Sequence, residues 1–196
     1  MTKSIIMSVS PEEALNILNG KQTALLRKRI PKDYKGWVYG YVKKEKPYLY
    51  DFSNLDYGIS DEIINQQYHI SLNQTIPFKF RLQDYAIYES CEEYYQPKRD
   101  EDFNKCSSSF LLKMLNTTRE DFKNYGNGKD LYVLKIDNLT IFDTIFDEPM
   151  QLSDFIVDFI DSDTDINGNE VDWYKLPIPL QKPPKTYQYV WVKEGE

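Results

Sequence analysis

The chain has 196 residues and a formal net charge of −7, which is enough for one domain with a proper core but too acidic for a general nucleic-acid binder. No stretch approaches the roughly 18 apolar residues of a membrane helix, and the first residues lack the apolar run of a signal peptide, so we expect a cytoplasmic protein without a membrane segment. Cys91 and Cys106 fit free thiols, and without further cysteine or histidine nearby they make no zinc site.

The first elements are a strand, a capped helix and a basic strand. Residues 4–9 predict the strand, and Ser10 with Glu13 three positions later forms a capping box for a helix from Pro11 to about Leu18. Gly20 is the expected left-handed stop of that helix. Residues 23–29 and 37–42 then predict two strands with a basic loop between them.

The rest of the chain alternates strands with a few short helices. We expect a strand at 47–52, paired with 37–42 through the basic turn at 43–46, and further strands at 76–88, 131–136, 139–142 and 187–192. Helices are expected at 61–67, 110–115 and 118–125, with Thr118 as cap and Gly126 as stop of the last. This mixture without regular β-α alternation favours a small mixed α+β barrel.

Charge is distributed unevenly along the chain. Residues 21–46 hold nine Lys or Arg against Asp33 and Glu45, whereas residues 143–172 hold ten acidic side chains and no basic one. The pattern indicates one basic and one acidic face, and solvated loops that keep the chain soluble explain it equally well.

The helix exit and the strand after the basic loop resemble the ASCH domain, a branch of the PUA-like β-barrels. The matching residues are Ile17, Leu18, Gly20, Lys21, Thr23, Arg27, Gly36, Trp37, Val38 and Tyr41. Blocks at 118–126, 129–136, 143–155 and 183–190 look like later parts of ASCH-containing proteins common in bacteriophages and prophages. The resemblance implies one ASCH domain over residues 1–196, a PUA-like mixed β-barrel with short helices and loop insertions at about 56–104 and 160–173.

Because the ASCH domain is generally thought to bind RNA, the resemblance implies non-catalytic binding of RNA or a modified nucleotide in a basic cleft beside the Gly20 to Arg29 motif. Lysine and arginine suit phosphate, threonine offers a hydroxyl, and aromatic rings offer stacking faces. An aromatic row on one strand face also suits a core. The candidate site residues are Lys21, Thr23, Arg27, Lys28, Arg29, Trp37, Tyr39 and Tyr41.

Some ASCH proteins are amidohydrolases that act on acylated cytidine, using a lysine and a threonine of this motif with a downstream glutamate. Alignment on Gly20, Thr23 and Arg27 puts Gln22 at the lysine position and Leu25 at the threonine position. Leucine supplies no nucleophile and glutamine does not titrate, which disfavours hydrolysis by that mechanism. We therefore expect no catalytic residue and no cofactor.

An alternative is a phage counter-defence protein whose acidic segment 143–172 occupies a basic nucleic-acid channel on a host protein. The candidate contacts are Phe155, Asp158, Phe159, Asp161, Asp163, Asp165 and Trp173. Residues 163–168 begin like a calcium loop, but Tyr174 occupies the twelfth position, where a glutamate belongs. An Asn-Gly turn on an acidic surface explains the same residues, so no metal is expected.

Overall fold

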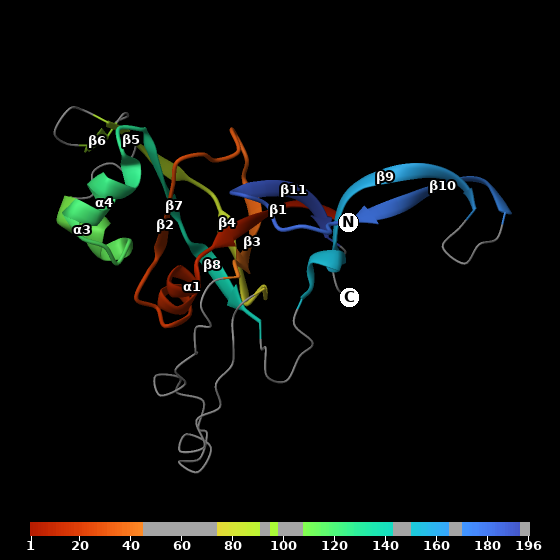
Figure 1. Cartoon of the computed structure of the whole chain (residues 1–196), viewed down its shortest axis with the longest axis horizontal. Coiled ribbons are helices and arrows are strands. Elements are labelled where there is room, and N and C mark those ends of the chain that lie inside the picture. Colours follow the sequence, from red (N-terminus) through yellow and green to blue (C-terminus); the bar gives the residue numbers. More distant parts are fainter. Residues whose placement is uncertain (45–73, 91–94, 98–107, 143–149, 165–169, 193–196) are drawn as a thin grey trace, which may run out of the picture.

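Two β-sheets joined by strands that run from one into the other form the body of the protein (Figure 1). The computed structural model describes residues 1–44, 74–90, 95–97, 108–142, 150–164 and 170–192. Its elements are β1 (Thr2–Val9), α1 (Pro11–Leu18), β2 (Ala24–Arg27), β3 (Gly36–Val42), β4 (Phe78–Leu82), β5 (Tyr85–Ser90), β6 (Tyr95–Pro97), α3 (Ser108–Met114), α4 (Arg119–Gly126), β7 (Leu131–Lys135), β8 (Asp137–Ile141), a 3-10 turn (Leu152–Asp154), β9 (Phe155–Thr164), β10 (Glu170–Pro179) and β11 (Tyr187–Val192).

The larger sheet has seven strands in the order β10-β9-β11-β1-β3-β4-β8, and the smaller has four in the order β2-β7-β5-β6. β1 and β3 are parallel, and every other described pairing is antiparallel. Only two residues separate β4 from β5, and only Ile136 separates β7 from β8. The fold is therefore mixed and mostly sheet, as expected, but the two sheets do not close into the predicted barrel.

Local sequence signals explain the start and end of α1. The Glu13 amide donates to the Ser10 hydroxyl at 3.1 Å, and the Ser10 amide donates to the Glu13 carboxylate at 3.1 Å. Gly20 follows the helix with φ of +67°, the left-handed conformation that favours glycine. Both predictions are confirmed. In α4 the Thr118 cap is also confirmed, but Asn127 at φ 47°, and not Gly126, is the left-handed residue.

Three apolar clusters hold the elements together. The first lies between the sheets and α1 and includes Ile5, Ile17, Leu25 and Phe80. In the second, β2, β5 and β7 of the smaller sheet pack against α3 and α4, which lie together at one end of the molecule in Figure 1. The third covers the opposite face of the larger sheet. No helix in the described ranges is long and apolar enough to span a membrane.

The acidic segment differs most from its prediction. Where loops and an insertion at 160–173 were expected, β9 and β10 form an antiparallel pair that extends away from the body (Figure 1). Strand propensity missed them because aspartate is rare in strands and β10 contains Pro177 and Pro179. β10 is an edge strand, the position in a sheet that tolerates proline.

Other predicted strands have different neighbours or bounds in the structure, and some predictions fall outside the described ranges. β3 was expected to pair with residues 47–52, but β1 and β4 occupy its two sides. The predicted strand 76–88 is two strands, β4 and β5. The expectations for residues 47–52, 61–67, Cys91, Cys106 and Asp165 lie outside the described residues.

Candidate functional site

A polar cleft of about 690 Å³ lies where the parallel strands β1 and β3 end, next to α1. In doubly wound folds, ligands bind outside the carboxyl ends of parallel strands in the same way. The start of α1, part of β2, the end of α4 and the chain before β11 complete its wall. The lining residues are Ser8, Ser10, Glu12, Glu13, Asn16, Gln22, Leu26, Arg27, Lys43, Leu115, Asn116, Thr117, Asp121, Tyr125, Lys185 and Thr186.

Arg27 forms a fixed, buried part of this wall. It is 5% exposed, and its guanidinium donates to Glu13 Oε1 at 2.7 Å, to the Leu26 carbonyl at 2.7 Å and to the Ser8 carbonyl at 3.1 Å. Burial has the largest single effect and would lower the pKa of Arg27, but the Glu13 carboxylate and Tyr125 together outweigh it and the pKa is raised. Arg27 is therefore charged and already paired, and Glu13 both caps α1 and neutralises it.

Tyr125, from α4, stands beside Arg27 at the cleft. Its hydroxyl is close enough to the Arg27 guanidinium for the two pKa values to be linked, and the Lys28 ammonium lies 5.0 Å from its ring centroid. Burial raises the pKa of Tyr125 more than Arg27 lowers it, so the phenol stays protonated at neutral pH. The ring is 42% exposed and offers an apolar surface with a hydrogen-bonding end.

Gln22 is held at the cleft by its own backbone surroundings. It is 6% exposed, and its Nε2 donates to the Ala24 carbonyl at 2.8 Å. The main chain around it is fixed on two sides, because the Thr23 amide donates to the Met114 carbonyl and the Thr23 carbonyl accepts from Ile136. A rigidly placed side-chain amide supports recognition by hydrogen bonding and not proton transfer.

Two lysines stand on opposite sides of the cleft. Lys43 follows β3, where its amide donates to the Val9 carbonyl at 3.0 Å. Lys185 belongs to a segment fixed to β1, since the Ser8 hydroxyl donates to the Pro184 carbonyl at 2.6 Å and the Ser8 amide to the Thr186 carbonyl at 3.0 Å. Both lysines are exposed, so their ammonium groups are available to a ligand.

The lining as a whole is polar but not basic. Arg27, Lys43 and Lys185 are balanced by Glu12, Glu13 and Asp121, so the expectation of a basic cleft is not met by these residues. Asn16, Gln22 and Asn116 add side-chain amides. Among the described residues, no group of three or more histidine, cysteine or acidic side chains is placed to hold a metal ion.

Of the eight residues predicted for this site, the structure brings only Arg27 to the cleft wall. Lys21, Thr23 and Arg29 are close to Arg27 in sequence and are exposed. The Lys28 ammonium lies over the ring of Tyr125, which lines the cleft. The buried pair with Glu13 places Arg27 in a different role from the phosphate contact we expected.

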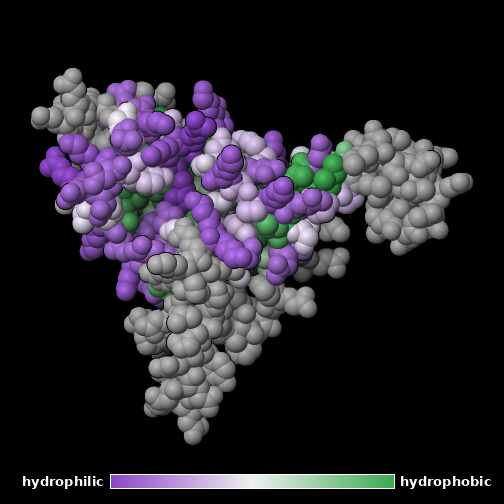
Figure 2. Space-filling view, in the orientation of Figure 1, coloured by the Kyte–Doolittle hydropathy of each residue, from purple (hydrophilic) through white to green (hydrophobic). Residues whose placement is uncertain are grey.

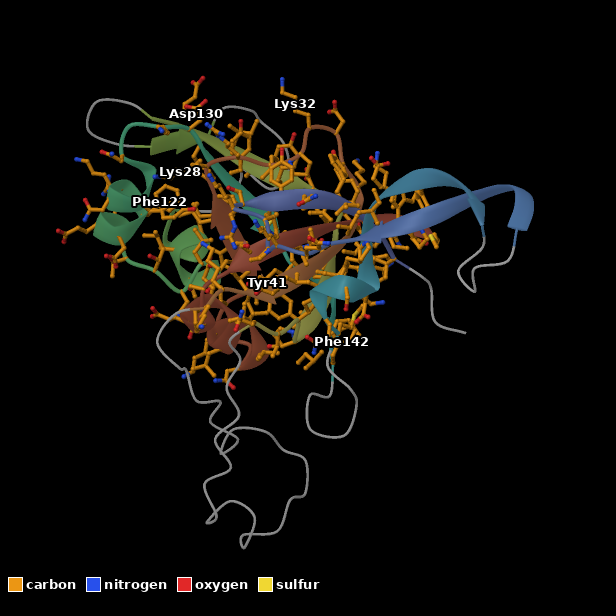
Figure 3. All side chains as sticks on the ribbon, turned by 45° about the vertical axis from the view of Figure 1, so that its right-hand side comes forward. Lys28, Lys32, Tyr41, Phe122, Asp130 and Phe142 are labelled. Atoms are coloured by element: carbon orange, nitrogen blue, oxygen red, sulfur yellow. The ribbon has the colours of Figure 1, made fainter. Side chains whose placement is uncertain are left out.

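The aromatic residues of β3 are engaged elsewhere. Tyr39 and Tyr41 are 6% and 2% exposed in the third apolar cluster, and burial raises the pKa of Tyr41. Trp37 is half-buried, and the Lys79 ammonium lies 4.7 Å from its ring centroid. Tyr41 lies within the body in Figure 3. The aromatic row of β3 is therefore mainly part of the core, which is the alternative that its position on one strand face left open.

The described residues of the alternative acidic site all lie on the paired strands β9 and β10. Phe155 is 0% exposed and belongs to the core, so it is not a surface anchor. Asp158 is exposed and Phe159 is half-buried on β9. Asp161 and Asp163 lie on β9 and Trp173 on β10.

The cleft contains residues that the motif analysis passed over. Tyr125, Lys185 and Thr186 lie within the blocks that carry the later part of the family resemblance, and that signal could have found them. Lys43 was counted only as part of a basic turn. No sequence signal links Glu13 to Arg27, because the pairing arises from the packing of α1 beside β2.

Comparison with known proteins was made at three levels. No family model matches the chain, and no curated protein matches its sequence. Solved structures do match. The crystal structure of the ASCH protein from Zymomonas mobilis is 12% identical with a TM-score of 0.43, over 97% of this chain and 88% of that one. A serine-to-alanine mutant of that protein matches with 12% identity and a TM-score of 0.42, over 97% of this chain and 89% of the other.

These matches are ASCH structures. The name ASCH is also that of the family that the Gly20 to Arg29 motif resembles. At this identity and TM-score, the matches assign no activity and no residue role to this chain. They also say nothing about bacteriophages.

Proposed function

We propose that the cleft binds a nucleotide, or an unpaired nucleotide of RNA, without covalent chemistry. The observation that carries this proposal is the combination of fixed hydrogen-bonding groups at the base of the cleft with two exposed lysines at its sides. Gln22 and Asn16 suit the edges of a base, Tyr125 offers a ring face, and Lys43 and Lys185 suit a phosphate. The balanced charge of the lining favours a single small ligand over a long polyanion.

The same geometry argues against hydrolysis by the amidohydrolase mechanism. Leu25, at the position of the nucleophilic hydroxyl, is 0% exposed inside the first apolar cluster. Gln22, at the position of the lysine, has its amide nitrogen bonded to the backbone. We therefore propose recognition alone and expect no release of cytidine from acylated cytidine.

Titration calorimetry with nucleoside monophosphates and the matching nucleosides tests this function. Replacing Lys43 and Lys185 together by alanine should weaken nucleotide binding about tenfold or more, because charge-assisted hydrogen bonds contribute about 1.5–3 kcal/mol. Nucleoside binding should change little. The matched control replaces Lys113 and Lys123, exposed lysines of α3 and α4 that lie outside the cleft. The proposal fails if no nucleotide binds, or if the control pair weakens binding as much as the cleft pair.

We also propose a second candidate function, in which the acidic hairpin engages a basic channel on a host nucleic-acid-binding protein. The observation that favours it is that β9 and β10 carry the acidic segment away from the body (Figure 1). Complementary charge mainly raises the encounter rate. Reversing Asp158, Asp161 and Asp163 to lysine should abolish salt-sensitive capture of the partner and leave nucleotide binding unchanged. Equal capture by the reversed variant contradicts this function.

A further inference from the structure

β11 directs an aromatic row to one face of the larger sheet. Tyr187, Tyr189 and Trp191 alternate along the strand and therefore share a face. Tyr187 packs against the first apolar cluster, whereas Tyr189 and Trp191 are 39% and 36% exposed. The row thus begins in the core and continues onto the surface.

Neighbouring side chains hold this row in place. Tyr189 makes edge-on ring contacts with Tyr34 at 5.8 Å and with Tyr187 at 6.5 Å between centroids. The Tyr34 hydroxyl donates to the Trp37 carbonyl at 2.8 Å, which fixes that ring on the β2–β3 loop. Preorganised rings lose little conformational entropy when a ligand stacks on them.

Cations lie on the side of the row that faces β1. Lys3 is paired with Trp191 across β1 and β11, and its ammonium lies 4.7 Å from the Tyr189 ring centroid. The β2–β3 loop that carries Tyr34 also holds Lys28, Arg29, Lys32 and Lys35, all exposed, against a single acidic residue, Asp33. Figure 3 shows Lys32 projecting outward from this loop.

The side of the row that faces β9 is acidic. Ile156 of β9 is paired with Trp191, and Asp158, two residues further on, lies on the same face and is exposed. An anionic ligand that stacked on the row would therefore extend toward the basic loop and not along the β9–β10 hairpin. The described surface in Figure 2 is mostly hydrophilic, with apolar areas near the start of β9.

We propose that Tyr34, Tyr189, Trp191 and Lys3, together called the aromatic surface, bind single-stranded RNA by stacking of its unpaired bases. Aromatic rings interleaved with lysine are the arrangement that single-strand binders use, with rings for the bases and cations for the backbone. Lys3 already lies beside a ring, where a phosphate flanking a stacked base would meet it. Tyr189 and Trp191 lie two residues apart on the same face of β11, and Tyr34 lies beside them on the β2–β3 loop, so successive bases can be accommodated.

The aromatic surface is separate from the cleft. None of its four residues lines the cleft, and the aromatic residues of β3, expected to stack, are buried or covered by Lys79. The two proposals can therefore fail independently. Mononucleotide binding depends on the cleft, whereas binding of a longer single strand depends on the aromatic surface.

Fluorescence anisotropy with a labelled oligouridylate of about twelve nucleotides tests the proposal. Replacing Tyr189 and Trp191 together by leucine should weaken binding by about tenfold or more, since stacking contributes about 1–3 kcal/mol per base. The matched control is Trp37→Phe, which alters a tryptophan beneath Lys79 and should leave the affinity within about twofold. Circular dichroism establishes that both variants are folded.

Two further binding measurements test whether stacking and Lys3 account for the affinity. Lys3→Gln should reduce both the affinity and its salt dependence while keeping the strand pairing intact, and a blunt RNA duplex should bind far less tightly because its base faces are covered. Mononucleotide calorimetry on the leucine variant should match the parent. The proposal is overturned if the parent binds no single strand, if the folded leucine variant keeps the parent affinity, or if the duplex binds as tightly.

Discussion

Replacing Glu13 by glutamine isolates the charge of the buried ion pair from the capping role of the same side chain. The glutamine oxygen can still accept from the Ser10 amide, so the capping box survives, but Arg27 at 5% exposure loses its only described carboxylate partner. Removing one member of a buried pair costs about 3–5 kcal/mol. The Glu13 side chain is 28% exposed and Arg27 keeps two carbonyl acceptors, so we expect about 2–3 kcal/mol.

Urea unfolding measures this loss directly. With a slope of about 2 kcal/mol/M, the midpoint should fall by about 1 M without a change of slope. Glu12→Gln is the matched control, because Glu12 is the exposed neighbour on the same helical turn and should change stability by less than about 0.5 kcal/mol. Arg27→Met should cost less than Glu13→Gln, because it leaves a carboxylate that water can reach. The reasoning is refuted if Glu13→Gln and Glu12→Gln shift the midpoint equally.

Three further outcomes follow from the described contacts. Gly40→Ala should lower the free energy of unfolding by about 1–3 kcal/mol, because its Cβ would lie 2.4 Å from the buried Phe78 ring. Gly36→Ala should cost less, because its Cβ would meet only the end of the Tyr34 side chain, at 2.6 Å. Thermal unfolding midpoints rank the two variants, and the reverse order would contradict the packing. Burial raises the pKa of Tyr34 to about 12, so this tyrosine ionises first in the unfolded state and stability should fall as pH rises from about 10 to 12. Comparison of the urea midpoints at about pH 8 and pH 11 measures this fall, which should be smaller in Tyr34→Phe. An unchanged fall in that variant refutes the assignment. Chromatography after prolonged incubation with acylated cytidine should show no enzyme-dependent cytidine, and its release would show that the Gln22 and Leu25 alignment is wrong.

The helices and central strands follow from local signals, which is why they could be predicted. Ser10, Glu13 and Gly20 define α1 through contacts within a few residues, and the apolar alternation from Phe78 to Leu82 defines β4. The β9–β10 pair depends on neighbours in the sheet, so its acidic sequence gave no strand signal. The cleft combines residues from α1, β2, α4 and the segment before β11. Gln22, Leu26 and Arg27 lie within the Gly20 to Arg29 motif, and the remainder required the tertiary arrangement.

The pairing of β1 with β11 sets the order in which the protein can complete its folding. β1 lies in the middle of the seven-stranded sheet, yet one of its two neighbours is the last described strand, with Ile5 opposite Tyr189. Such distant contacts require closure of a very long loop before they contribute any stability. During synthesis, the β11 side of β1 therefore stays unpaired until almost the whole described chain has emerged. An unpaired central strand with Ile5, Ile6 and Met7 is a target for chaperones and for aggregation.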